Sequence, residues 1–426
     1  MNKDTAEAPC FLHTYLARQP IFDTRSKVWG YELLFRGGPN AERADISDLD
    51  QATLDVAADS TIAAEDFYGS DKKILLNFGE QNILESVPYA LPPGQTVIQI
   101  PESALASDET IEALRDLVRN GYSIAVDDFE GKVPVGKDLA DLVIIDTLGK
   151  SPAELAPILD KAKEAGALML AKRVEDMETF SMAKELGFPL FQGYFFKRPE
   201  LVSGKKLTSH QASRFSLLKA IEQKDPDFEA LAKDIQTDVS ISYRLLTYLN
   251  SAAFSFTQPI QSIKQAIVLL GWKQLRSWLR VIVLTDLQPK GKSSELFFIA
   301  VQRGKFLELI SHSHDQSKAD PDSMFLLGLL SLLEAMLEMP MADIVGKLPL
   351  AQDLKSALLG EDTDHAKWLE LVRAHEKGKW EDLDHLTDKL GLNRLVVAVS
   401  YYKSVLWANT FFKHGPAEAD QATEES

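Results

Sequence analysis

Residues 124–128 read Ile124-Ala125-Val126-Asp127-Asp128, an apolar run that ends in two carboxylates. Other short apolar runs along the first half of the chain also end in a polar residue: Asn77, Gln99, Asp146, Lys172 and Gln192. Continuous apolar runs of this length are typical of strands buried on both faces, as in parallel sheets. The polar residues that follow such strands meet at one edge, where active sites are commonly built.

Helical stretches at 110–120, 153–165 and 177–186 separate these runs. Alternation of strand and helix predicts a β/α barrel or a doubly wound sheet. Strand patterns stop after residue 199, and from residue 213 apolar residues recur at the three- and four-residue spacing of helices. We therefore predict an α/β domain over 1–204, an all-α domain over 205–413 and a disordered acidic tail over 414–426.

Composition narrows the classes of function. The chain has 426 residues, 45% apolar residues and a net charge of -17, which argues against a general nucleic-acid or anionic-membrane surface. Its one cysteine, Cys10, allows neither an internal disulfide nor a Cys-based zinc site. No apolar stretch reaches the roughly 20 residues of a membrane helix. We expect a soluble cytoplasmic protein.

The polar residues also form motifs in a recognisable order. Arg18-Gln19-Pro20-Ile21 precedes Gly30-Tyr31-Glu32-Leu33-Leu34-Phe35-Arg36, and Asn77, Asp127-Asp128-Phe129 and Gln192-Gly193-Tyr194 follow. This order resembles EAL domains, the barrel family that hydrolyses the bacterial second messenger cyclic di-GMP. The resemblance implies a TIM-like β/α barrel over the first 204 residues. It also implies that carboxylates at the strand ends of active members hold two divalent metals.

Three positions depart from the pattern of active members. Gln99 stands in place of a glutamate, Lys172 in place of a metal-site glutamate, and Ile144 in place of a lysine proposed to act in catalysis. An ammonium close to a metal position repels a dication, so we expect Lys172 to act as counter-ion to Asp127 or Asp128. We therefore predict no enzymatic activity, no catalytic residue and no cofactor.

Binding of cyclic di-GMP without hydrolysis stays open. The alternative is that Glu32, Asp127 and Lys172 only form an ion network that closes the barrel mouth. The candidate ligand-binding residues are Gln19, Glu32, Leu34, Arg36, Asn77, Asp127, Asp128, Lys172, Glu175 and Gln192. Residual metal candidates are Glu32, Asn77 and Asp127, and Mg²⁺ or Mn²⁺ is expected only if the chain is an active phosphodiesterase with an altered metal site.

The helical half resembles an HDOD domain, a relative of metal-dependent HD hydrolases without their metal ligands. The resemblance rests on 234–246, 249–254 and 263–271, the last of which ends in Leu269-Leu270-Gly271. His314-Asp315 is a literal HD pair, but it lies beside a polar, proline-containing stretch that is typical of a turn. We expect no metal centre in this half.

An EAL barrel followed by HDOD resembles bacterial signalling proteins of the YuxH type. The resemblance implies a signal-transduction regulator or scaffold that acts through contacts with unidentified protein partners. The sequence is also compatible with a homodimer. The alternative function is a metal-dependent cyclic di-GMP phosphodiesterase.

Overall fold

A computed structural model of the chain describes residues 15–36, 72–136, 138–197, 209–223, 263–286, 294–313, 319–348 and 350–412, with single positions at 227, 231, 235, 241 and 245. The predicted tail at 414–426 lies outside these residues, as does the His314-Asp315 pair. The stretches 234–246 and 249–254, on which the HDOD resemblance partly rests, fall mostly outside them as well.

The first half forms a closed barrel in which eight strands follow one another in sequence order. The predicted α/β barrel is therefore confirmed. The strands are β1 (Tyr15–Asp23), β2 (Val28–Arg36), β3 (Lys73–Asn77), β4 (Thr96–Pro101), β5 (Ser123–Asp127), β6 (Leu142–Asp146), β7 (Leu168–Lys172) and β8 (Leu190–Gln192).

One strand runs against the others. β1 pairs antiparallel with both β2 and β8, whereas the pairs from β2 to β8 are parallel. The linker between Asp23 and Val28 explains the reversal, because a parallel pair needs a crossover of about a dozen residues or more. Asp23 Oδ1 accepts hydrogen bonds from the Arg25 and Lys27 amides at 2.8 and 2.9 Å, which fixes the tight turn.

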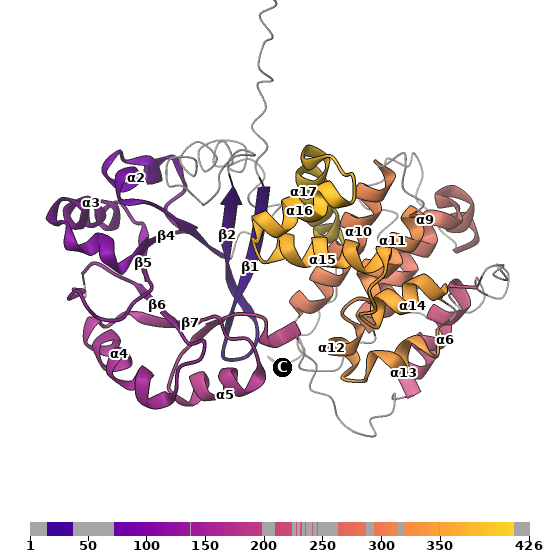
Figure 1. The fold of residues 1–426 in the computed structure, drawn as a ribbon, viewed down its shortest axis with the longest axis horizontal. Helices are drawn as coiled ribbons and strands as arrows, with labels where there is room; N and C mark the ends of the chain where they lie inside the picture. The colour runs from indigo at the N-terminus through magenta and orange to yellow at the C-terminus, as the bar shows by residue number, and fades with distance from the viewer. Residues whose placement is uncertain are drawn as a thin grey trace, which may run out of the picture. The chain divides into compact units, whose positions relative to one another are not determined.

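Helices lie outside the strands (Figure 1). They are α2 (Glu80–Leu84), α3 (Asp108–Arg119), α4 (Pro152–Ala165) and α5 (Met177–Glu185), with short 3₁₀ turns η1 (Val87–Ala90), η2 (Glu102–Ala106) and η3 (Phe195–Lys197). The sequence encodes the ends of α4 clearly. Ser151 and Glu154 form a capping box at its first turn, and Gly166 ends it at a φ of 70°.

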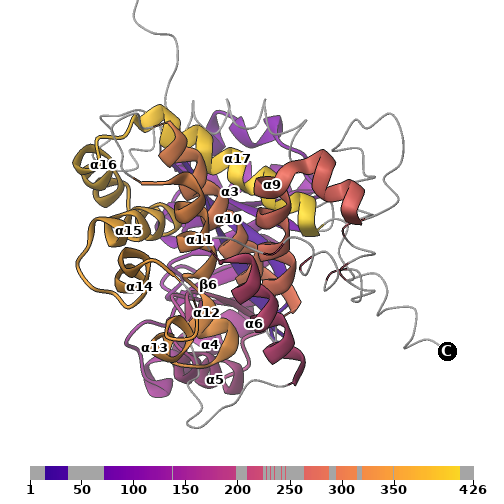
Figure 2. The same cartoon turned by 90° about the vertical axis from the view of Figure 1, so that its right-hand side faces the viewer.

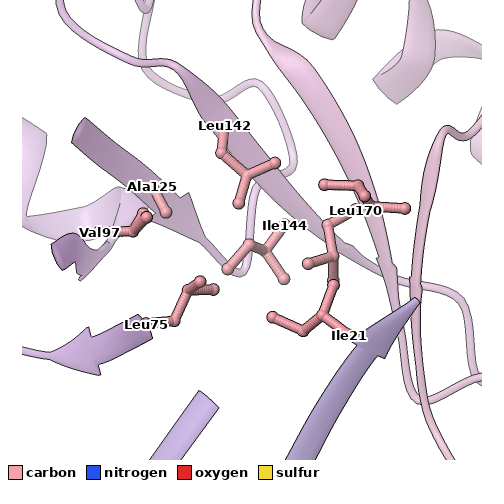
Figure 3. Packing of buried hydrophobic residues seen from close by; sticks show 8 residues of the cluster. Ile21, Leu75, Val97, Ala125, Leu142, Ile144 and Leu170 are labelled. Atoms are coloured by element: carbon pink, nitrogen blue, oxygen red, sulfur yellow. The ribbon is translucent and has the colours of Figure 1, made fainter. Parts of the chain in front are cut away.

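Apolar side chains fill the inside of the barrel (Figure 3). The cluster comprises Ile21, Leu75, Val97, Ala125, Leu142, Ile144, Leu170 and Leu190. Ile144 is 1% exposed. The position at which active EAL domains are expected to carry a lysine is therefore part of the packed interior.

The second half is helical, as predicted. Its helices are α6 (Ser209–Ile221), α9 (Ile263–Asp286), α10 (Ser294–His312), α11 (Pro321–Leu330), α12 (Leu333–Leu337), α13 (Met341–Val345), α14 (Gln352–Leu358), α15 (Asp364–Glu376), α16 (Trp380–Lys389) and α17 (Arg394–Phe412). α10 packs along α11, and α6 along α9 (Figure 2). Gly271 breaks the helical backbone inside α9 at a φ of 73°. None of the helices in the described ranges combines the length and apolarity of a membrane span.

The chain forms two compact units. The first contains the barrel together with Glu370–Leu406, and the second contains most of the remaining helices. Within the first unit, Tyr15 on β1 stacks on Trp380 with ring centroids 5.8 Å apart and meets His375 edge-on at 6.0 Å. C-terminal helical residues therefore cover the start of the first strand.

Candidate functional site

Glu32 on β2 is the centre of a hydrogen-bond network at the strand ends. Its Oε1 accepts from Asn77 Nδ2 at 3.0 Å and from Gln99 Nε2 at 3.3 Å, while its Oε2 accepts from Gln192 Nε2 at 2.5 Å. Strand order explains the convergence: Asn77 on β3 lies opposite Gln99 on β4, and β3 is the parallel neighbour of β2. Three neutral amides therefore surround one carboxylate that is 3% exposed.

The second carboxylate, Asp127 at the end of β5, is joined to the same network. Its Oδ2 accepts from Gln99 Nε2 and from Lys172 Nζ, both at 2.7 Å, and its Oδ1 accepts from the Asp128 amide at 2.9 Å. Gln99 Nε2 thus bridges Glu32 and Asp127. We refer to Glu32, Asn77, Gln99, Asp127, Lys172 and Gln192 as the strand-end network.

Lys172 carries the positive charge of this network. Burial lowers the pKa of its ammonium, but the charges of Glu32, Asp127 and Asp128 outweigh burial, so the pKa is raised above its ordinary value. The lysine is therefore charged at neutral pH. With two carboxylates and one ammonium, the strand-end network bears a net charge of about -1. As expected, Lys172 is a counter-ion, and its partner is Asp127.

Of the other predicted ligand-binding residues, only some contact the strand-end network. Gln19 on β1 joins it, since its Oε1 accepts from Gln192 Nε2 at 3.4 Å. Asp128 is exposed and has a positive φ of 49°, and Glu175 is half-buried. Leu34 is half-buried near Gly378 rather than among the polar strand ends. The side chain of Arg36 lies outside the described residues.

Two further carboxylates at strand ends have other partners. Asp146 pairs with Arg173, whose Nε lies 2.7 Å from Asp146 Oδ1. Glu102 accepts hydrogen bonds from the Glu130 and Val133 amides at 2.8 and 3.0 Å, so it holds the loop that follows β5. Their polar positions after strands do not distinguish these structural carboxylates from the two in the network.

The donor set can be tested against the divalent metals that the EAL resemblance implies. Both oxygens of Glu32 and both of Asp127 already accept hydrogen bonds from N–H groups. The one network oxygen that is buried without a partner is Gln99 Oε1. A hard dication requires about six oxygen ligands, so this arrangement does not fit one. In the described part of the chain, no group of three or more metal-binding side chains comes together.

Tyr194 is the third residue of the Gln192-Gly193-Tyr194 motif and lies two residues after the end of β8, and it was not predicted as a site residue. Its hydroxyl accepts from Gln19 Nε2 at 3.3 Å and donates to the Glu376 carbonyl at 3.3 Å. Lys377 Nζ lies 4.7 Å from the centre of its ring. Tyr194 therefore links the strand-end network, through Gln19, to the end of α15. The motif itself was the signal that could have drawn attention to this residue.

The helical half contains a buried charge network that the sequence did not predict. Arg280 Nε and Nη2 donate to Glu222 at 2.5 and 2.7 Å, and Arg280 Nη1 donates to Asp322 at 2.8 Å. Arg276 joins the same two carboxylates at 2.9 and 3.0 Å. The two arginines on α9 balance the charges of the two carboxylates. Because Glu222 follows α6 and Asp322 lies on α11, the cluster connects these two helices with α9. Periodicity alone does not separate such arginines from solvated ones.

Ser331 lies at the C-terminal end of α11. Its hydroxyl donates to the Gly328 carbonyl at 2.7 Å and accepts from Arg303 Nη1 at 2.9 Å. The serine thus ends α11 and anchors a cation from α10. This contact agrees with a structural role for the position.

Comparison with known proteins finds a family match in the helical half and two relatives that match along most of the chain. An HDOD domain matches residues 207–338. YuxH of Bacillus subtilis (strain 168), an uncharacterised protein, is 34% identical over 391 residues, which cover 89% of this chain and 94% of YuxH. The cyclic di-GMP phosphodiesterase CdgJ of Vibrio cholerae serotype O1 is 30% identical over 411 residues, which cover 93% of this chain and 92% of CdgJ. An EAL domain protein of Listeria monocytogenes EGD-e is 23% identical at a TM-score of 0.35, covering 44% of this chain and 88% of that one.

Our prediction that the chain is not an enzyme is contradicted by the comparison with CdgJ, a phosphodiesterase similar over nearly the whole length. The prediction equated the loss of carboxylates at positions 99 and 172 with the loss of chemistry. Two buried carboxylates and a charged lysine nevertheless remain together at the strand ends. With a closed barrel followed by an HDOD region, and with similarity to YuxH and CdgJ along most of its length, the chain belongs to the EAL–HDOD family of cyclic di-GMP signalling proteins.

Proposed function

We propose that the chain is a cyclic di-GMP phosphodiesterase whose reaction centre is the strand-end network. The observation that carries this proposal is the meeting of Glu32, Asp127 and Lys172 at one end of the barrel. The similarity to CdgJ supports the choice of substrate. Contacts with protein partners and a homodimer remain predictions from the sequence.

The two carboxylates suit different tasks. Glu32 is 3% exposed and holds three amides, so it is a positioning residue. Asp127 is 9% exposed and lies beside Lys172, so water reaches it more readily. We assign Asp127 as the general base, which is the role of a carboxylate within hydrogen-bond reach of the attacking water.

The reaction then balances without a further reactant. A water oxygen forms a bond to phosphorus, and the bond from phosphorus to the ribose 3′ oxygen breaks. The proton that leaves the water passes to Asp127 and from there to the departing oxygen. One phosphodiester becomes a phosphomonoester and a hydroxyl, and the ammonium of Lys172 stabilises the charge that develops on the phosphate oxygens.

The test is an assay of purified full-length protein with cyclic di-GMP, in chelator and with Mg²⁺ or Mn²⁺, with chromatographic detection of the linear product. Asp127→Asn keeps the shape of the side chain and removes the base, so we expect turnover to fall by roughly 10²- to 10⁴-fold. Asp160→Asn on the exposed face of α4 is the matched control and should leave turnover unchanged. Absence of product from the unaltered protein under every condition would overturn the proposal.

A further inference from the structure

The strand-end network already contains a cation, the ammonium of Lys172, which can bind a phosphate. All the carboxylate oxygens of Glu32 and Asp127 face N–H donors, and one of those donors is the ammonium of Lys172. A dication placed here would have to displace these donors and would lie close to a positive charge, which is unfavourable at short range. The network therefore occupies the room that a metal would need.

Exposure indicates which group an incoming anion meets. The side chain of Lys172 is 25% exposed, that of its partner Asp127 is 12% exposed, and Glu32 is 3% exposed. The positive charge is thus the most accessible of the three charges. Of these three charged side chains, the ammonium is therefore the one that an anion in solvent reaches most readily.

Asp127 also remains satisfied when Lys172 turns away from it. Its Oδ1 keeps the Asp128 amide at 2.9 Å, and its Oδ2 keeps Gln99 Nε2 at 2.7 Å. Leaving a buried carboxylate without donors would be strongly unfavourable, and the bridging amide of Gln99 prevents this. The glutamine at position 99 and the lysine at position 172 therefore act as a pair: one holds the carboxylate while the other is free to hold a ligand.

From these contacts we propose that Lys172 is the phosphate-binding cation of the site, and that the barrel binds cyclic di-GMP without a divalent metal. On binding, the ammonium exchanges Asp127 for a non-bridging phosphate oxygen. The inference rests on the proposed function only in taking cyclic di-GMP as the ligand. It concerns binding and does not require turnover.

The test is calorimetric titration of the full chain with cyclic di-GMP in chelator. We expect saturable binding by the unaltered protein and a roughly 10- to 100-fold weaker affinity for Lys172→Met, because a charge-assisted hydrogen bond is lost. Lys163→Met removes an exposed lysine from α4 and is the matched control, with unchanged affinity expected. Binding that appears only with Mg²⁺ or Mn²⁺, or equal affinity of Lys172→Met and the unaltered protein, would overturn the proposal.

Lys172→Glu gives a second and independent measurement. It places a carboxylate where the EAL pattern has one, next to Asp127, and removes the internal cation. We expect this variant to bind cyclic di-GMP only when Mg²⁺ or Mn²⁺ is present, with circular dichroism used to verify that it folds. Tight binding by Lys172→Glu in chelator would contradict the role of the ammonium.

The same experiments separate this inference from the proposed hydrolysis. Binding in chelator without product under any condition would overturn the phosphodiesterase proposal and leave the role of Lys172 standing. No binding of cyclic di-GMP under any condition would overturn both.

Discussion

At the scale of single residues, His375 on α15 is a fully buried imidazole outside the strand-end network. It stacks on Tyr401 with ring centroids 3.8 Å apart and meets Tyr15 and Trp380 edge-on. Burial lowers its pKa to about 3, and the charge of Glu376 opposes this effect without cancelling it. The folded protein therefore keeps His375 neutral over most of the acidic range.

This burial predicts a pH dependence of stability. In the unfolded chain the histidine takes up a proton below a pKa of about 6.5, whereas the folded protein excludes that proton down to about pH 3. Stability is complete above pH 6.5 and falls between these values, by about 2 kcal/mol at pH 5. The loss in the free energy of unfolding is measured by urea unfolding of the unaltered protein and of His375→Phe at pH 7.5 and pH 5. The loss on acidification should be about 2 kcal/mol smaller in the variant, and an equal loss in both proteins would contradict the assignment.

At the scale of elements, glycines allow α10 and α11 to approach each other closely. A Cβ atom added at Gly328 on α11 would lie 2.5 Å from the carbonyl carbon of Arg303 and 2.6 Å from the amide nitrogen of Gly304, both on α10. A Cβ atom at Gly304 would in turn meet the Phe325 carbonyl at 2.8 Å. The two helices approach backbone to backbone, so neither position has room for a methyl group.

Gly328→Ala is therefore expected to destabilise the protein by about 1–3 kcal/mol through overpacking. A loss of stability would be informative, because alanine in an unobstructed helix interior is more favourable than glycine by about 1 kcal/mol and would raise stability. Thermal unfolding measures the change. Gly94→Ala is the control, since no atom lies within 4 Å of a Cβ added there. A higher melting temperature for Gly328→Ala would show that the helices can separate without loss.

At the scale of the whole molecule, the compact unit that contains the barrel also includes residues far along the chain. Glu370–Leu406 belong to that unit. Tyr15 is only 2% exposed and contacts rings of α15 and α16, and the Tyr194 hydroxyl donates to the Glu376 carbonyl. The C-terminal helical residues thus cover part of the barrel. They also contact Tyr194, which is hydrogen-bonded to Gln19.

A fragment of residues 1–204, the predicted first domain, would lose this cover. We expect a lower melting temperature and a smaller soluble fraction than for the full chain, because exposed apolar and aromatic surface promotes association. The same fragment carrying Leu34→Ser, which removes an apolar side chain beside Gly378, should regain part of its solubility. Equal melting temperatures of the fragment and the full chain would contradict the packing of Glu370–Leu406 with the barrel.

The sequence by itself determined the alternation of strands and helices and the change to an all-helical second half, and the order of its motifs chose the barrel over a doubly wound sheet. Parallel strands that are buried on both faces are apolar along most of their length, so their runs are visible without a structure. The polar residues at their ends were visible for the same reason. The reversal of β1 was also encoded, in the four residues between Asp23 and Val28, although the apolar pattern does not show strand direction.

Only the tertiary structure decided which polar residues act together. Asp127 and Asp146 follow similar apolar runs, yet Asp127 joins Gln99 and Lys172 while Asp146 pairs with Arg173. The choice depends on strand register and on contacts between residues 28 to 67 positions apart, as in the Gln99 contacts to Asp127 and Glu32. The packing of α15 and α16 beside β1 is of the same kind. Local patterns record burial, whereas pairing across the fold is fixed by distances that a one-dimensional pattern does not contain.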